Sequence, residues 1–286
     1  MNQHPLLPNL VSSAISTNEV ASEFILTKEY QRFAEFCDAC RRYRYIGLCY
    51  GAPGVGKTVS AQVYADWERL TYLGNLQRNE IPEVPEVVVH RTVLYTVPVT
   101  SSPGRILREI VQLRVTLNYV LMAMASVSTA GTSAAHALRR GDMTELVLVD
   151  ESDRLRTNTL EQIRDIYDRS QIGVVLIGMP GLEKRLERYP QLYSRVGFVH
   201  QFRPLSAREM GGVLPVKWQQ LSVPYDPDDP QQKEASAMVM RMTGGNFRLL
   251  HRLFMQIERI MEINQLHVIT KEVVETARES LIIGVT

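Results

Sequence analysis

The residues best suited to chemistry are a glycine-rich run at Gly51–Thr58 and an acidic pair at Asp150–Glu151. The run has the sequence GAPGVGKT, a complete Gly-x-x-x-x-Gly-Lys-Thr pattern between an apolar segment and a helical one. Glycines in such a loop let backbone N–H groups curl around phosphate oxygens, and the amino end of the following helix adds positive potential. The pattern therefore predicts a site for the phosphates of a nucleotide.

Each residue of this loop has an expected role. Lys57 is expected to reach the β- and γ-phosphates, and Thr58 to supply a hydroxyl ligand to Mg²⁺. ATP and Mg²⁺ are therefore the predicted cofactors. The rest of the predicted nucleotide contacts come from the neighbouring loop positions, which are Gly51, Pro53, Gly54, Val55, Gly56 and Val59.

The acidic pair follows four apolar residues, Leu146–Val149, whose pattern predicts a buried strand. At the carboxyl end of that strand, Asp150 is expected to bind Mg²⁺ through water. Glu151 is expected to polarise the attacking water. An acidic pair after a strand is also common as a solvated turn. Its pairing with Lys57 and Thr58 in one αβ pattern favours a catalytic role.

Phosphoryl transfer also needs cations, because negative charge spreads over the γ-phosphate. Arg248 follows a glycine pair and opens a helical segment, so we expect it to point back at the nucleotide. Arg195 precedes the last expected strand and is the expected finger into a neighbouring subunit. Arg188 and Arg203 compete for that role. Each arginine could instead be a surface residue paired with a carboxylate.

A stretch with phosphate-contact chemistry precedes the third expected helix. Thr100, Ser101 and Arg105 combine hydroxyls, a glycine turn and an arginine at a helix start, and we predict that they bind DNA. No helix-turn-helix or zinc finger that reads bases is visible. The net charge of +1 means that DNA contact must come from a local patch or from many subunits together. A solvated charged face is the alternative.

These residues require a layered scaffold, and the periodicity predicts one. Strands are expected at residues 45–50, 87–99, 146–149, 172–177 and 196–202. Helices are expected at residues 28–42, capped by Thr27, then 58–70, 106–124 after a break at Pro103 and Gly104, and around 160–167. A loop is expected at residues 126–135. The alternation predicts an α/β fold with a parallel sheet and helices on both faces.

The character of the chain changes near residue 205. Ser206 and Glu209 form a capping box, and a helix is expected directly after it. Further helices are expected at residues 232–242, at residues 247–263 and after Thr270. We therefore expect three parts: a flexible arm at 1–23, a nucleotide-binding α/β domain at 24–204 and a helical lid domain at 205–286.

Composition limits the setting in which the chain works. Its 286 residues are 45% apolar and 22% charged, which is ordinary for a globular protein. No apolar run approaches the roughly 20 residues that span a bilayer, and no signal peptide is visible, so we expect no membrane. Three cysteines without a disulfide pattern suit the cytoplasm. Cys37 and Cys40 are interpreted as packing residues of one helix face rather than metal or redox groups.

Five segments together resemble one family. The chain resembles the AAA+ transposition regulators of the TniB/TnsC type, which are related to IstB and MuB, over residues 27 to 280. The segments that carry the resemblance are GAPGVGKT at 51–58, LVLVDESDRL at 146–155, VVLIGMPGLEKRL at 174–186, LYSRVGFVHQFRPL at 192–205 and GGNFRLLHRLF at 244–254.

The resemblance implies a P-loop NTPase that assembles as an ATP-dependent homo-oligomeric ring or helical filament on double-stranded DNA. Such proteins recruit a transposase, respond to target-site-selecting proteins, and disassemble as ATP is hydrolysed. It also implies that Arg248 is the second sensor, Arg195 the finger acting in trans, and the loop from Thr100 to Arg105 the DNA-facing one. One departure is Met179, which stands where many AAA+ proteins have a polar sensor, and it favours slow hydrolysis.

Two other functions fit the same motifs. A helicase loader or replication initiator shares the AAA+ core, but it favours single strands and a helicase partner. No helicase-binding zinc module is visible, which favours the transposition regulator. A signalling NTPase without nucleic-acid contact is the third hypothesis.

Overall fold

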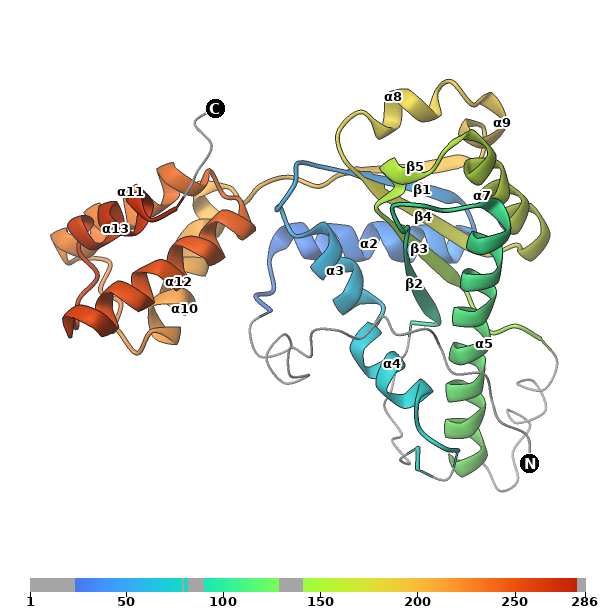
Figure 1. The fold of residues 1–286 in the computed structure, drawn as a ribbon, viewed down its shortest axis with the longest axis horizontal. Helices are drawn as coiled ribbons and strands as arrows, with labels where there is room; N and C mark the ends of the chain where they lie inside the picture. Colours follow the sequence, from blue (N-terminus) through green and yellow to red (C-terminus); the bar gives the residue numbers. More distant parts are fainter. Residues whose placement is uncertain (1–23, 79, 82–89, 129–140, 282–286) are drawn as a thin grey trace.

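The computed structural model describes residues 24–78, 80–81, 90–128 and 141–281 (Figure 1). The predicted arm at residues 1–23 lies outside these residues, as do parts of the expected strand at 87–99 and loop at 126–135. The described residues contain one parallel sheet with strand order β2-β3-β4-β1-β5. The strands are β1 (Ile46–Tyr50), β2 (Thr92–Thr96), β3 (Leu146–Asp150), β4 (Gly173–Gly178) and β5 (Val196–Gln201).

Helices cover both faces of this sheet, as predicted. One face packs against α5 (Pro103–Ser128) and α7 (Thr157–Ser170), with Leu48, Val149 and Leu176 among its buried strand residues. The other face, with Leu148 and Ile177, packs against α2 (Lys28–Tyr43) and α3 (Lys57–Tyr64). Strands β1, β3 and β4 are almost entirely apolar because helices exclude water from both of their faces, whereas alternate residues of the edge strand β5, such as Val199, are exposed. The helices of this part are α2 (Lys28–Tyr43), α3 (Lys57–Tyr64), α4 (Trp67–Gly74), α5 (Pro103–Ser128), α7 (Thr157–Ser170), α8 (Leu182–Leu186) and α9 (Pro190–Tyr193).

The prediction of a single helix at residues 58–70 is wrong in one respect. The segment is two helices, α3 and α4, because the backbone at Asp66 is left-handed, with φ of 46°. A left-handed residue ends an α-helix, and the chain restarts in a new direction. The N-cap at Thr27 is confirmed, since its side chain accepts a hydrogen bond from Tyr30 N at 3.1 Å.

Two other boundaries also differ. Strand β2 covers only Thr92–Thr96 of the range expected for it. Helix α5 includes Pro103 and Gly104, where a break was expected, and it continues to Ser128 into the expected loop. Proline is compatible with the first helical position because the N–H that it lacks has no partner there.

The C-terminal helices, which are the part predicted to be a lid, form a separate group beside the sheet (Figure 1). They are α10 (Ala207–Gln220), α11 (Pro230–Thr243), α12 (Phe247–Asn264) and α13 (Lys271–Glu279). Trp218, Leu250 and Ile257 are central to a core of their own. The predicted capping box is confirmed: Ser206 and Glu209 exchange side-chain and backbone hydrogen bonds at the start of α10.

All strands run in the same direction, so their carboxyl ends meet at one edge of the sheet. The loop at Gly51–Thr58 leaves β1 at this edge, and Asp150 ends β3 there. Strand β4 lies between these two strands. The edge is therefore where the predicted phosphate loop and acidic pair meet.

Candidate nucleotide-binding site

The loop between β1 and α3 needs its glycines. Gly54 and Gly56 have φ of 80° and 108°, in the region that favours glycine. A Cβ on Gly51 would lie 2.2 Å from the backbone oxygen of Phe202, which follows β5. The loop therefore curls tightly at the carboxyl end of β1, against the segment that leads to the lid.

Lys57 is the buried cation of this loop. Its Nζ donates to the backbone oxygens of Gly51 at 2.6 Å and of Ala52 at 2.9 Å, and the residue is 9% exposed. Burial lowers the pKa of Lys57, against the opposing effect of nearby carboxylates that include Asp150 and Asp153. Phosphate oxygens are stronger acceptors than carbonyls, so an ammonium in this position is suited to exchange them.

Thr58 and Asp150 meet across the site. Thr58 Oγ1 donates to Asp150 Oδ2 at 2.8 Å, and Asp150 Oδ1 accepts from Glu151 N at 2.8 Å. Asp150 is only 3% exposed. A hydroxyl and a carboxylate held together are the hard oxygen ligands that Mg²⁺ takes in phosphate sites. These two residues therefore fit the ion predicted for them.

Glu151 lies at the open side of the acidic pair. Its backbone is left-handed, with φ of 56°, at the start of the short 3-10 helix η1 (Ser152–Arg154). Glu151 Oε2 is 3.4 Å from Arg154 Nη2, and this guanidinium also donates through Nη1 to Val97 O at 2.7 Å. Both side chains of the pair are more than a third exposed, so solvent screens this contact and leaves Glu151 accessible to water.

The lid reaches the phosphate loop through the start of α12. Arg248 N donates to Gly54 O at 3.0 Å, and Asn246 Nδ2 donates to Pro53 O at 2.8 Å. The residue Arg248 is exposed, and no ion pair to it is found among the described residues. The backbone of Arg248 therefore lies beside the loop, and Asn246 lies there as well; that the Arg248 side chain points at a nucleotide stays a prediction. The signal for Asn246 was its position before a helical segment, where asparagine is a preferred cap.

Comparison with known proteins fits this geometry. A sequence profile described as an AAA domain matches residues 40–186, which include the phosphate loop and the acidic pair. The chain belongs to this AAA family. A Staphylococcus aureus protein described as a potential ATP-binding protein is 44% identical over 268 residues, which are 92% of this chain and 97% of that one.

Solved structures share the fold of this AAA protein at low sequence identity. The Thermotoga maritima RuvB Holliday junction branch migration motor has a TM-score of 0.54 and 16% identity, over 91% of this chain and 71% of that one. Aeropyrum pernix ORC1, solved in complex with DNA, has a TM-score of 0.54 and 19% identity, over 90% and 66%. The predicted P-loop NTPase fold of the AAA+ kind, with helices after the sheet, is confirmed.

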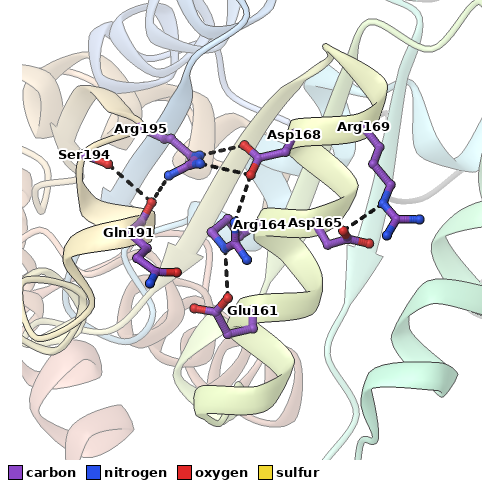
Figure 2. Close-up of polar contacts among 8 residues, drawn as sticks. All are labelled: Glu161, Arg164, Asp165, Asp168, Arg169, Gln191, Ser194 and Arg195. Carbon is purple, nitrogen blue, oxygen red and sulfur yellow. Dashed lines mark hydrogen bonds and ion pairs between the residues drawn. The ribbon is translucent and has the colours of Figure 1, made fainter.

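Arg195, the expected finger, lies where the amino ends of the strands meet, opposite the phosphate loop. Ile46 N donates to Arg195 O, at the amino end of β1 and far from the phosphate loop of the same chain. Its guanidinium forms two bonds to Asp168 on α7, at 2.6 and 3.0 Å, and also donates to Gln191 O (Figure 2). Arg195 therefore cannot serve its own site and is held by a neighbouring carboxylate.

The two competitors of Arg195 are both exposed. No ion pair to Arg188 or Arg203 is found among the described residues. The backbone N–H of Arg203 donates to Glu29 Oε1 at 3.1 Å, which ties the entry to the lid to α2. Burial alone would raise the pKa of Glu29, but the nearby His200 ring and the hydrogen bonds from Arg203 N and Arg32 outweigh it, so the pKa lies below its usual value.

The predicted DNA-contact residues lie after β2, at the same edge as the phosphate loop. Thr100 is exposed and Ser101 half-buried. Arg105 is paired: its Nε lies 2.7 Å from Glu109 Oε1, and its Nη1 donates to Thr100 O at 3.4 Å. Tyr95 also donates to Glu109. The local charge of Arg105 is therefore partly neutralised, while Arg108 on the next turn is exposed.

The position of Met179 reveals another residue that the sequence did not single out. Met179 N donates to Asp153 Oδ1 at 2.7 Å, so a carboxylate from η1 holds the chain that leaves β4. Asp153 also contributes to the electrostatic environment of Lys57. The only sequence signal was its place three residues after Asp150.

The cysteines belong to the core between α2 and the sheet. Cys37, Cys40 and Cys49 are buried among Phe33, Phe36 and their neighbours. Burial raises the pKa of all three thiols, that of Cys40 to about 12. The described residues contain no cluster of three or more metal-ligating side chains and no helix long and apolar enough to cross a membrane.

Proposed function

We propose that this AAA protein binds ATP with Mg²⁺ and hydrolyses the γ-phosphate bond. The observation that carries the proposal is the bond from Thr58 to Asp150 beside the buried ammonium of Lys57. Hydroxyl, carboxylate and ammonium converge at the carboxyl edge of a parallel sheet, where such folds bind ligands. The description of the S. aureus relative as a potential ATP-binding protein supports the same function.

Each residue of the proposed site has a separate role. Lys57 exchanges the Gly51 and Ala52 carbonyls for phosphate oxygens. Thr58 would hold a Mg²⁺ ion through its hydroxyl and Asp150 would hold it through water, and the bound ion would neutralise phosphate charge. Glu151 orients the attacking water and accepts its proton. Arg248 contacts the nucleotide from the lid, and Arg195 of a neighbouring subunit completes the charge stabilisation.

Two variants test the ATPase. In Lys57→Ala, ATP binding measured by equilibrium titration should be lost. In Glu151→Gln, ATP should bind as in the unaltered protein while turnover falls by roughly 10²-fold or more, because a general base contributes on that order. A Glu151→Gln enzyme with unchanged turnover would refute the assignment of the base.

We propose further that the ATPase acts on double-stranded DNA as a regulator of transposition, with a transposase and a target-site-selecting protein as partners. The five segments that carry the TniB/TnsC resemblance support this, as does the exposed loop at Thr100 beside the nucleotide site. Oligomers form in the ATP-bound state and come apart after hydrolysis. Because Met179 offers no polar side chain for positioning water, we propose that turnover is slow.

A replication initiator or helicase loader is the second candidate. The fold shared with Aeropyrum pernix ORC1 supports it. The two functions differ in the DNA that they prefer: the first predicts duplex DNA, and a helicase loader predicts single strands and a hexameric helicase.

Electron microscopy with and without a non-hydrolysable ATP analogue tests the choice. The expected result is rings or filaments on duplex DNA only with the analogue, and none on single strands. Assemblies on single strands would favour the loader. Monomers in every condition, together with no duplex shift in gels, would favour a nucleotide-dependent signalling protein instead.

A further inference from the structure

The lid is fastened to the phosphate loop by two hydrogen bonds to consecutive carbonyls. Asn246 Nδ2 donates to Pro53 O at 2.8 Å, and Arg248 N donates to Gly54 O at 3.0 Å. The contact is close: a Cβ on Gly54 would lie 2.5 Å from Asn246 Oδ1 and 2.8 Å from Arg248 Cβ. The lid therefore rests directly on the tip of the loop.

These bonds fix which way two peptide groups face. In a trans peptide, the C=O of one residue and the N–H of the next point in opposite directions. With the oxygens of Pro53 and Gly54 turned toward α12, the N–H groups of Gly54 and Val55 turn away from the lid. Among the described residues, neither N–H donates to a protein acceptor. These are donors of the kind that a phosphate loop directs at its ligand.

We propose that Asn246 is a positioning residue for nucleotide phosphates. By holding the carbonyl of Pro53, its amide aims the N–H of Gly54 into the loop before the ligand arrives. The proposal rests on the nucleotide site proposed above, and it assigns no contact between Asn246 and the nucleotide itself.

The same side chain also begins the lid helix. Asn246 Oδ1 accepts a hydrogen bond from Leu249 N at 3.2 Å and shares the N–H of Arg248, at 3.1 Å, with Gly54 O. One end of the amide thus caps α12 while the other end holds the phosphate loop. Linkage is reciprocal, so phosphates that favour this loop conformation also favour the docked lid. The orientation of the lid therefore reports whether the loop is filled.

Two substitutions separate capping from positioning. Asn246→Ser keeps a cap oxygen for α12 but has no amide that reaches Pro53. Asn246→Ala removes both functions. A matched control is Asp229→Ala, which removes the cap of α11, where Asp229 Oδ1 accepts from Gln231 N at 3.1 Å, away from the phosphate loop.

The experiment measures binding of ATP and of inorganic tripolyphosphate to the full chain by titration calorimetry. In Asn246→Ser, both affinities should fall about fivefold, which is the effect of one hydrogen bond. Both ligands should lose affinity because the affected contacts are those with the phosphates, which both ligands contain. Asp229→Ala should bind both ligands as the unaltered chain does. Hydrogen exchange should show that ATP protects the first turn of α12 in the unaltered chain, and that this protection is reduced in Asn246→Ser.

Three results would overturn the inference. An unchanged ATP affinity in Asn246→Ser would leave Asn246 as a helix cap alone. An equal loss in Asp229→Ala would assign the effect to general stability of the lid. Failure of the unaltered chain to bind ATP would instead refute the proposed function, and this inference with it.

Discussion

Replacing Asp168 by asparagine should release Arg195 from the pair that holds it in the single chain. The pair has bonds of 2.6 and 3.0 Å, and its side chains are 30% and 32% exposed. Solvent screening limits the stabilisation from such a pair to about 1 kcal/mol, which corresponds to a factor of about five in an equilibrium constant. If Arg195 serves a neighbouring subunit, it must leave Asp168, and the pair opposes that step.

The assay is ATPase rate against protein concentration, with duplex DNA present. At concentrations below half-maximal assembly, Asp168→Asn should raise the rate per subunit by up to about fivefold, and Arg195→Ala should remove the concentration-dependent part of the rate. Nucleotide affinity of the monomer should not change in either variant, because both residues lie at the far edge of the sheet.

The neighbours of Asp168 supply the control. In Asp168→Asn, Arg164 keeps Glu161 as a partner at 2.8 Å (Figure 2). Asp165→Asn makes the same change of charge on the same helix, and Asp165 pairs with Arg169 rather than Arg195. Equal rises in Asp165→Asn and Asp168→Asn would indicate a general charge effect. Full concentration-dependent activity in Arg195→Ala would refute the reasoning and pass the finger role to another arginine.

Other predictions concern separate parts of the chain. Arg108→Ala should weaken duplex binding and reduce the slope of log affinity against log salt by about one, whereas Arg105→Ala should have a smaller effect because Glu109 already pairs with it. Gly245→Ala should destabilise the lid by about 2 kcal/mol or more in thermal unfolding, since its φ is 75° and a Cβ would lie 2.1 Å from Leu205 O. Gly244→Ala, with φ of 53° and open space, should cost less. At pH 8 the native chain should show almost no thiol reactivity, because burial raises the pKa of Cys40 to about 12 and raises those of the other two thiols.

Each of these predictions has a contrary result. Equal losses in Arg105→Ala and Arg108→Ala would show that Glu109 does not neutralise its partner. Equal losses of stability in Gly244→Ala and Gly245→Ala would show that the backbone at Leu205 moves away to make room for the added methyl group. Rapid labelling of native thiols would point to reactive cysteines rather than packing residues.

The phosphate loop and the acidic pair could be located from sequence because their signals are local. A strand, a glycine turn and a helix start occur within a few residues of Gly51, and four apolar residues precede Asp150. The structure then joins the two patterns through Thr58. The break at Asp66 had no such signal, since neither glycine nor proline marks it.

Most partners of the arginines could be identified only from the folded structure. Asp168 is 27 residues from Arg195 in sequence, and only the packing of α7 beside the start of β5 brings them together. The Asn246 contact with Pro53 spans 193 residues. Glu109 is different, because its spacing of four from Arg105 on one helix makes their pairing recognisable in advance.

The separate hydrophobic cores of the sheet and the lid have a consequence for how the chain melts. Each core excludes water by itself, and residues near 205 and 245, with the contacts at Pro53 and Gly54, join the two parts. Such cores open as distinct cooperative units, so calorimetry without nucleotide should show two transitions. A ligand that requires both parts adds its binding free energy to the joined state. Saturating nucleotide should therefore raise the midpoint temperature of the lower transition toward that of the upper one, until the chain unfolds as a single unit.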